Sequence, residues 1–587
     1  MPVTTRTNKS LTRSLGPQRW DEWVTHLASR AGPLPPWARI SAGRRCPLSW
    51  SLAPPAPSES GRGLLRRMER WLRAERLPAA EIARAVEPWL SSAERRATDM
   101  EFALECLGWS YLLPRLAKVL PAAPWCEVWD GLIALAAEPD AASPAWDSPL
   151  VRQLLAGELA WTLADQFPEL ARCRALGRMA RRRLSAGVRE LLADSGLPHC
   201  QHVELVRPLL ACWTRCRKLV RADGTICFDR EAARRYERFV RQALQLSRQD
   251  GGRVFSANGS GPHDVELLDT ALELAGRDED LAVAGQLLPW RAAGGEAGAE
   301  PDQLPSSSVY SEAAQLASLR PSWHRGSMHL VVGHHEGAVR TELNLGSTTV
   351  WSGNWLVQLR VGNTLLEPRA WEEVCWHSDD DVDYLELETN WPGSWKLQRQ
   401  ILLAREEHFL WLADAVTGPE TETLDYRSVL PLAPGIEFRG ETETCEGELR
   451  NRRRLARVLP VAIPEWRLAA ATGGLEAGPG GLQLRQRTQA RGLYAPLFLD
   501  LSPHRQKWPL TWRQLTVAEK LQIQSPDVAV GYRVQVGGDQ WLFYRSLTDL
   551  ASRTLLGQNI RHEFYAARFD TEGEADELLA LDPAGTS

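Results

Sequence analysis

The spacing of hydrophobic residues changes near the middle of the chain. Up to about Trp290, apolar residues recur every three to four positions, which is the period of an amphipathic helix. Beyond the segment 291–308, short runs alternate apolar and polar residues, as half-buried strands do. The pattern therefore predicts a helical region followed by a β region.

Several segments of the first region carry both a helical apolar face and end signals. The segment 63–77 places five apolar residues on one face: Leu64, Leu65, Met68, Trp71 and Leu72. Ser148 precedes Pro149, which is a cap followed by a proline at the first helical position, and Asp229 can cap a later helix. About ten helices with short connections predict an array of helical hairpins, either closed into a toroid or open as a solenoid. No repeat of fixed length is present, which favours the toroid.

The second region predicts a large antiparallel sandwich. The runs 397–404 and 408–415 flank a short polar turn, and the runs 531–536 and 540–545 are joined by Gly537, Gly538 and Asp539. Strands recur from about residue 329 to residue 569. That number of strands indicates a sandwich rather than a small barrel.

Length and composition are consistent with a multidomain globular protein. The chain has 587 residues, and we predict an N-terminal extension (1–60), a toroid-like helical domain (61–290), a linker (291–308) and a β-sandwich (309–587). The net charge is −5 and no basic block is present, so nucleic acid is not an expected partner. The high Trp content, 25 residues in all, has two equally favoured interpretations: the indole rings stack on a ligand, or they fill the core.

The sequence contains no metal or membrane signature. Ten Cys are scattered without a CxxC pair, and no HExxH motif occurs, so we expect no metal and no cofactor. No run of 18 apolar residues occurs, which argues against a membrane span. The first 20 residues are polar and show no signal peptide. We therefore expect a cytoplasmic protein, or a periplasmic or secreted one if the true start lies elsewhere.

The order of the two regions, together with several segments, resembles the heparinase II/III-like polysaccharide lyases. These proteins join an α/α toroid to a C-terminal antiparallel β-sandwich. Three segments of the strand region carry the resemblance: 309–320 (VYSEAAQLASLR), 355–368 (WLVQLRVGNTLLEP) and the hairpin 397–418, in which Asp414 is the expected buried acid. In the helical region, the connections 194–205 and 250–258 resemble those that line the substrate groove.

The resemblance implies cleavage of uronate-containing glycans by β-elimination. This reaction needs a group that neutralises the uronate carboxylate, a base for the C5 proton and an acid for the leaving oxygen. Gln201 falls at a neutraliser position with His202 beside it, and His335 is the candidate histidine of the sandwich. The segment 351–355 (WSGNW) aligns with the family's HGHAD motif and contains no histidine. Its predicted substrate-binding residues are Trp351, Asn354 and Trp355.

Two other functions stay open on the sequence alone. A relative that has lost catalysis would bind an acidic polysaccharide or oligosaccharide, or a protein, without turnover. A glycoside hydrolase would need two carboxylates flanking the bond, and no such pair stands out in the sequence. The hydrolase is therefore the least favoured of the three.

Overall fold

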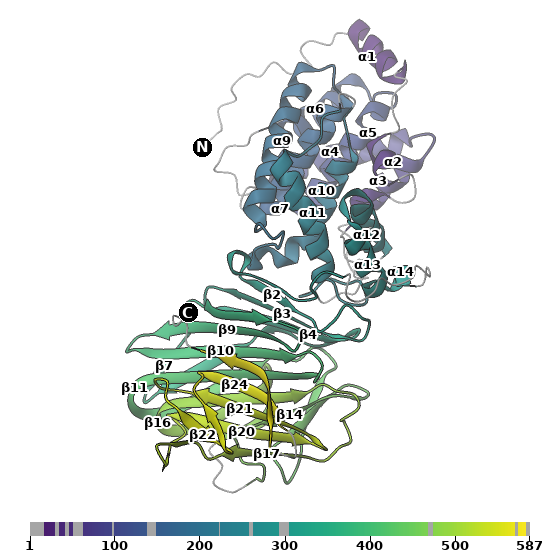
Figure 1. Cartoon of the computed structure of the whole chain (residues 1–587). Helices are drawn as coiled ribbons and strands as arrows, with labels where there is room; N and C mark the ends of the chain where they lie inside the picture. Colours follow the sequence, from purple (N-terminus) through teal and green to yellow (C-terminus); the bar gives the residue numbers. More distant parts are fainter. Residues whose placement is uncertain are drawn as a thin grey trace. The chain divides into compact units, whose positions relative to one another are not determined.

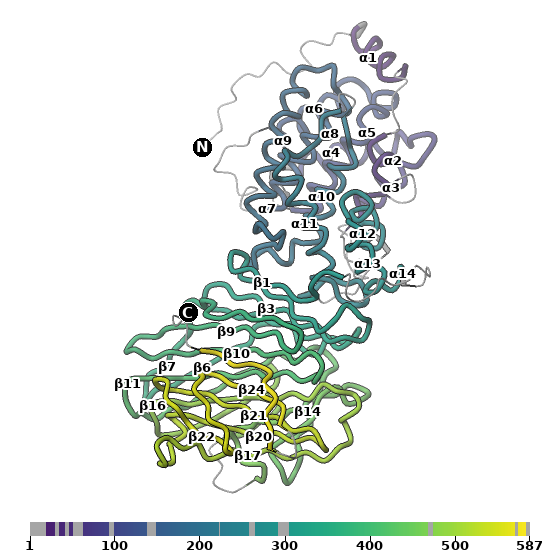
Figure 2. Tube along the Cα trace, viewed as in Figure 1, coloured from purple at the N-terminus to yellow at the C-terminus, as the bar shows by residue number. Residues whose placement is uncertain are grey.

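Helices form the first part of the chain and antiparallel strands form the second, in the order that the sequence pattern predicts (Figure 1, Figure 2). Two units result, Met1–Ala297 and Gly298–Ser587, and their division falls inside the predicted linker 291–308. The computed structural model describes residues 17–29, 35–41, 46–50, 63–96, 99–137, 148–221, 224–256, 262–292, 304–467, 473–569 and 573–582. Much of the linker, 293–303, lies outside these ranges.

The first unit consists of helices joined by short connections. Its α-helices are α1 (Pro17–Ser29), α2 (Pro36–Ser41), α3 (Gly63–Arg73), α4 (Ala79–Arg96), α5 (Met100–Leu116), α6 (Ala122–Ala136), α7 (Pro149–Arg152), α8 (Ala160–Gln166), α9 (Ala171–Leu191), α10 (Val206–Lys218), α11 (Arg230–Gln245), α12 (Pro262–Ala275), α13 (Asp278–Leu287) and α14 (Pro289–Ala292). The 3-10 helices η2 (Pro47–Ser49) and η5 (Cys200–Leu205) and the π-helix η4 (Gln153–Leu159) complete it.

Tryptophans and one buried ion pair hold the helical core. Trp125 stacks on Trp129 with ring centroids 5.7 Å apart, and both indoles are fully buried. Arg215 of α10 donates through Nε and one terminal nitrogen to the two carboxylate oxygens of Glu158, at 2.6 and 2.8 Å. These contacts assign the tryptophans of this core to packing.

The predicted helix caps are confirmed. The Val151 amide donates to the Ser148 hydroxyl at 3.4 Å, and the Ala232 amide donates to an Asp229 carboxylate oxygen at 2.9 Å. Burial alone would raise the pKa of Asp229, but the bonds from the Ala232 amide and from Arg189 outweigh it and hold this pKa below its ordinary value.

Replacing Asp229 with alanine is expected to lower the free energy of unfolding at neutral pH by about 1 kcal/mol, because the first turn of α11 loses its cap. Since the folded-state pKa is depressed, this contribution is present above the ordinary Asp pKa of about 3.9 and is lost as the pH falls through the folded-state value. Urea unfolding at pH 7 and at pH 3 measures the difference. The control Glu237→Ala, in the middle of α11, should change stability by less than about 0.5 kcal/mol at both pH values.

In its described residues (304–467, 473–569 and 573–582), the second unit contains four antiparallel sheets. The first sheet has the order β1 (Val309–Ser311), β2 (Leu316–Leu319), β3 (Met328–His335), β4 (Ala338–Leu345) and β5 (Thr348–Asn354). The largest sheet contains β6 (Leu356–Val361), β7 (Thr364–Leu366), β8 (Glu372–Ser378), β9 (Val382–Trp391), β10 (Trp395–Ala404), β11 (Phe409–Leu430), β12 (Glu437–Gly440), β13 (Gly447–Arg450), β14 (Arg454–Pro460), β15 (Gly473–Gly478) and β16 (Gly481–Asp500).

A third sheet faces the largest one, and a small fourth sheet is formed by four short strands from the same part of the chain. The third sheet has the order β17 (Leu510–Leu515), β20 (Ala529–Val536), β21 (Asp539–Ser546), β24 (Phe564–Phe569) and β25 (Ala575–Leu581). The fourth contains β18 (Ala518–Glu519), β19 (Gln522–Ile523), β22 (Arg553–Leu555) and β23 (Gln558–Ile560). Trp411 of β11 stacks on Phe543 of β21 at 3.9 Å, so the two sheets share one core. The predicted sandwich and both predicted hairpins, β10–β11 and β20–β21, are confirmed.

A buried ion pair joins β10 to β11. Arg399 and Asp414 are direct register partners, and the guanidinium donates to both carboxylate oxygens at 2.8 Å. Both side chains are 0% exposed, and the Tyr426 hydroxyl donates to the same carboxylate at 2.7 Å. The Arg399 guanidinium also lies 3.8 Å from the centroid of the Trp355 ring. The buried acid that the resemblance implies at Asp414 is therefore part of a structural network.

Candidate functional site

One face of the first sheet is polar, and it carries two of the residues predicted from the sequence. Side chains alternate between the faces of a strand, and directly opposed residues of neighbouring strands share a face. Arg340 of β4 lies opposite Asn354 of β5, and Glu342 lies opposite Ser352. Gly333 of β3 lies opposite Arg340, so His335, two residues further on, belongs to the same side. We call these residues, His335, Arg340, Glu342, Ser352 and Asn354, the polar face.

Arg340 and Asn354 can together bind a carboxylate. The β carbons of directly opposed residues lie about 4.5–5.5 Å apart, which is close enough for both side chains to reach one ligand. A guanidinium and a side-chain amide both donate hydrogen bonds, and a carboxylate accepts them. On the other side of Arg340, Gly333 presents no side chain. The arrangement supplies a cation and an amide donor at one point of the sheet.

His335 is oriented for proton transfer. Its Nδ1 lies 3.0 Å from the amide oxygen of Gln315, which can only accept, so Nδ1 carries the hydrogen. The lone pair is then on Nε2, 3.9 Å from the carboxylate of Glu336. The side chain of His335 is 40% exposed, which leaves the ring accessible. An imidazole whose Nε2 carries the lone pair can act as a base.

Glu342 holds β4 and β5 together beneath these groups. The Asn344 amide donates to one of its carboxylate oxygens at 2.9 Å, and the Ser352 hydroxyl donates to the other at 2.8 Å. The Thr349 hydroxyl in turn donates to Asn344 at 2.7 Å. Because Glu342 is fully buried and hydrogen-bonded at both oxygens, it fixes the two strands rather than presenting a free carboxylate.

The two predicted tryptophans lie in the core. Trp351 is 0% exposed and donates through Nε1 to the Thr341 hydroxyl at 3.1 Å, on the face opposite Asn354. Trp355 is 4% exposed, donates to the Ser428 hydroxyl at 2.7 Å and covers Arg399. These contacts favour packing roles, since a sugar ring stacks on an exposed indole face. Substrate binding by Trp351 and Trp355 stays a prediction that this burial does not support.

A tyrosine–histidine pair lies on the inner side of the first sheet. The Trp371 carbonyl accepts from His334 Nδ1 at 3.2 Å, so His334 Nε2 accepts from the Tyr310 hydroxyl at 3.3 Å. Burial lowers the pKa of His334 and raises that of Tyr310, so both groups are neutral at pH 7. Alternation along the strand places His334 and His335 on opposite faces, but it does not indicate Tyr310 as the partner of His334.

Gln201 and His202 lie together in the helical unit. Both belong to η5, and Gln201 Nε2 lies 3.4 Å from His202 Nε2. Gln201 is exposed, and the preceding turn is closed by a bridge between Leu192 and Pro198. Their roles as neutraliser and proton carrier stay predictions. The second predicted connection is held by Arg207, which donates to the Gly251 carbonyl at 3.2 Å, and its residues 257–258 lie outside the described part of the chain.

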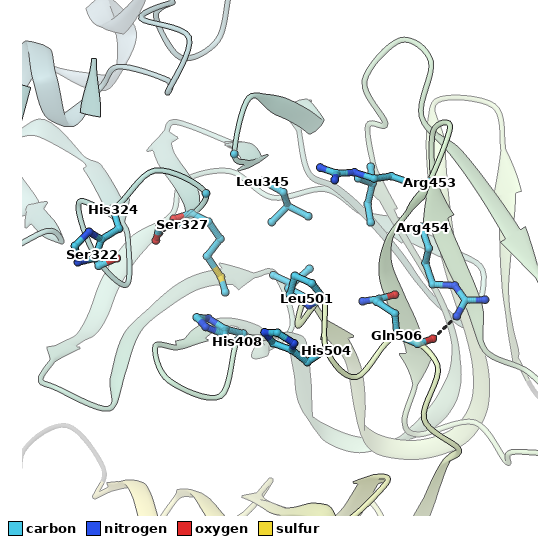
Figure 3. Close-up of a pocket in the computed structure, with 15 residues that line it drawn as sticks. Ser322, His324, Ser327, Leu345, His408, Arg453, Arg454, Leu501, His504 and Gln506 are labelled. Carbon is cyan, nitrogen blue, oxygen red and sulfur yellow. Dashed lines mark hydrogen bonds between the residues drawn. The ribbon is translucent and has the colours of Figure 1, made fainter. Parts of the chain in front are cut away.

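A pocket of about 670 Å³ opens at the other end of the first sheet (Figure 3). It begins at Met328, seven residues before His335, which corresponds to about 23 Å along a strand. His408 and His504 lie side by side in Figure 3, and Arg453 lies across the opening from them. Burial and the nearby Arg505 lower the pKa of His408. Five separate chain segments supply this lining, which is why no sequence motif indicates it.

The described residues contain one cluster with the spacing of metal ligands, and it is buried. Glu158, Cys212 and Cys216 converge in the core of the helical unit. Arg215 already occupies both oxygens of Glu158, and burial raises the pKa of Cys216 to about 12. A guanidinium therefore supplies the positive charge that a metal would bring.

Comparison with known proteins shows the fold. No family model matches the sequence, and no curated protein matches it. Among solved structures, the chain is similar to a mutant of heparan sulfate lyase HepC from Pedobacter heparinus, at 11% identity over 82% of this chain and 81% of that chain, with a TM-score of 0.57. A heparinase III with methylated lysines matches at 12% identity, 91% and 81% coverage and a TM-score of 0.56.

A second heparinase III structure matches at 11% identity over 82% of each chain, with a TM-score of 0.55. The chain therefore has a heparinase-like lyase fold, a helical region followed by a large antiparallel β region, as the resemblance implied. In the described residues, no helix is long and apolar enough to cross a membrane.

Proposed function

We propose that the protein is a polysaccharide lyase that cleaves a uronate-containing glycan by β-elimination. The observation that carries this proposal is the polar face, where His335, Arg340 and Asn354 occupy neighbouring strands of one sheet. The fold supports the same class, because the similar solved structures are a heparan sulfate lyase and heparinases III. An acidic polysaccharide is accordingly the proposed ligand.

Each polar-face residue has a chemical task in this reaction. Arg340 and Asn354 would donate hydrogen bonds to the uronate carboxylate, which stabilises the negative charge that develops when the C5 proton leaves. His335 Nε2 would accept that proton. The C5–H electron pair becomes the C4–C5 double bond, and the bond from C4 to its oxygen breaks. The leaving oxygen takes up a proton, so the products are an unsaturated uronate and a new reducing end.

The formation of the unsaturated product tests the proposal directly. Purified full-length protein is incubated with hyaluronan, heparan sulfate, chondroitin sulfate, alginate and pectate, and the ultraviolet absorbance of the unsaturated uronate is followed. We expect a rise with at least one polymer and none with uncharged dextran. A flat trace with all five polymers at neutral pH would contradict lyase activity. The variants Gln201→Ala and His202→Ala, assayed on the same polymer, test whether the helical residues take part.

The alternative is a protein that binds an acidic glycan without turnover. The observation that favours it is the histidine-free segment 351–355, which stands where the resembled family has its HGHAD motif. Calorimetric titration separates the two functions, because the alternative predicts heat of binding with a polymer whose absorbance stays flat. Binding should then weaken in Arg340→Ala, since the same guanidinium would contact the carboxylate.

A further inference from the structure

The helical unit contains a pocket lined mainly by arginines. Its volume is about 470 Å³, which is within the ordinary range for ligand pockets. Five of its nine lining residues are arginines: Arg174, Arg178, Arg181, Arg182 and Arg221. The others are Gly177, Ser185, Thr225 and Asp229.

The sequence of α9 builds most of this pocket. Arg174, Arg178 and Arg182 are spaced four residues apart and so follow one side of the helix. The other side of α9 is buried through Cys173, Leu176, Ala180 and Leu184. Arg221 reaches the same region from the segment that follows α10. The arginine side is therefore the solvent side of an amphipathic helix.

Three of the arginines are held in place by other groups. One terminal nitrogen of Arg174 donates to the carbonyls of Pro168 and Glu169, at 2.9 and 2.8 Å. Arg181 donates to the Phe228 carbonyl through two nitrogens, at 3.4 and 3.3 Å. The Arg221 guanidinium lies over the Trp161 ring, 5.6 Å from its centroid. These contacts fix the positive charges and involve no acidic side chain.

Among the described residues, little negative charge lies in the pocket. Asp229 is the one acidic residue of this described lining. One of its oxygens accepts from the Ala232 amide at 2.9 Å, and the other accepts from Arg189, outside the lining, at 2.7 Å. Arg178 and Arg182 are exposed and make no hydrogen bond or ion pair with any residue in the described part of the chain.

This distribution of charge opposes helix stability. Like charges four residues apart repel each other, and positive side chains near the N-terminus of a helix oppose its dipole. An anion in the pocket would relieve both effects. Guanidinium groups bind sulfate and carboxylate oxygens with paired hydrogen bonds, so several of them favour a ligand with several such groups.

We propose that this pocket binds a sulfated or carboxylated oligosaccharide segment. Anion binding follows from the pocket itself, whereas the saccharide identity of the ligand rests on the proposed function. The site is separate from Gln201 and His202, because neither residue lines the pocket, which extends along α9 from Arg174 to Ser185. It is a second, non-catalytic binding site for the acidic polymer.

Binding by full-length variants tests this assignment. The probe is a heparin-derived hexasaccharide, titrated calorimetrically at low salt, where screening is weak. The variant Arg178→Gln/Arg182→Gln removes two exposed charges that make no hydrogen bond or ion pair within the described part of the chain. Its matched control is Arg172→Gln/Arg234→Gln, which removes two exposed charges outside the pocket. We expect affinity to fall about tenfold or more in the pocket variant and less than about twofold in the control.

Three results would overturn the proposal. The first is equal affinity in the pocket variant and its control. The second is saturation of the pocket by inorganic sulfate with an affinity equal to that of the hexasaccharide. The third is equally tight binding of an oligonucleotide of the same charge.

The elimination assay separates this proposal from the proposed lyase function. Pocket-dependent binding without an absorbance rise contradicts only the lyase function, and an absorbance rise with pocket-independent binding contradicts only this site.

Discussion

Asp414→Ala is expected to lower the free energy of unfolding of the sandwich by about 3–5 kcal/mol, because it leaves the Arg399 guanidinium buried without its carboxylate. The Tyr426 hydroxyl loses its acceptor in the same step. Urea unfolding followed by tryptophan fluorescence measures the change, since Trp355 lies against Arg399.

Two further variants separate this network from a general effect of the strand. Asp425→Ala removes an exposed carboxylate from the same strand, β11, and should cost less than about 0.5 kcal/mol. Arg399→Met/Asp414→Leu replaces both charges with apolar groups and should be less destabilising than Asp414→Ala alone. Equal losses in Asp414→Ala and Asp425→Ala would show that the buried charge is not the cause.

His335→Ala is expected to lower kcat for the elimination by about 10²–10⁴-fold, which is the usual contribution of a general base. Stability should change little, because the side chain is 40% exposed and its hydrogen bond to Gln315 is only partly buried. Initial rates of absorbance increase measure kcat, and urea unfolding measures stability on the same samples.

The matched control is His377→Ala. His377 is also a strand histidine with a 40% exposed side chain, and its partner is Asp379. Its replacement should leave kcat within about twofold of the unmodified protein, because the proposed mechanism assigns the C5 proton to His335 and gives His377 no role. A kcat for His335→Ala equal to that of His377→Ala would remove His335 from the mechanism.

The order of elements and the local signals could be predicted from the sequence, because they depend on neighbouring residues. Ser148 and Asp229 cap helices where the sequence places them, and β10–β11 turns where polar residues interrupt the alternation. The resemblance predicts substrate binding by both Trp351 and Asn354, because their segment aligns with the HGHAD motif. Their side chains instead point to opposite faces, since they are three residues apart in a strand.

The remainder of the site depends on pairing between distant strands. Arg340 becomes a neighbour of Asn354 only through the register of β4 and β5, which shifts between Leu343 and Asn344. Tyr310 reaches His334 only because β2 lies between β1 and β3. Neither register nor strand order is encoded by local alternation, so neither pair could be derived from the sequence alone.

The register shift between β4 and β5 decides what a change in the length of β5 does to the polar face. Leu343 pairs with Trp351 and Asn344 pairs with Thr349, so Val350 is an extra residue in the strand. Deletion of Val350 would remove the bulge and make this pairing regular, with Trp351 still opposite Leu343 and Thr349 still opposite Asn344, so both side chains would keep their faces. A lineage could thus lose this residue by a single in-frame deletion and still keep Ser352 and Asn354 on the polar face.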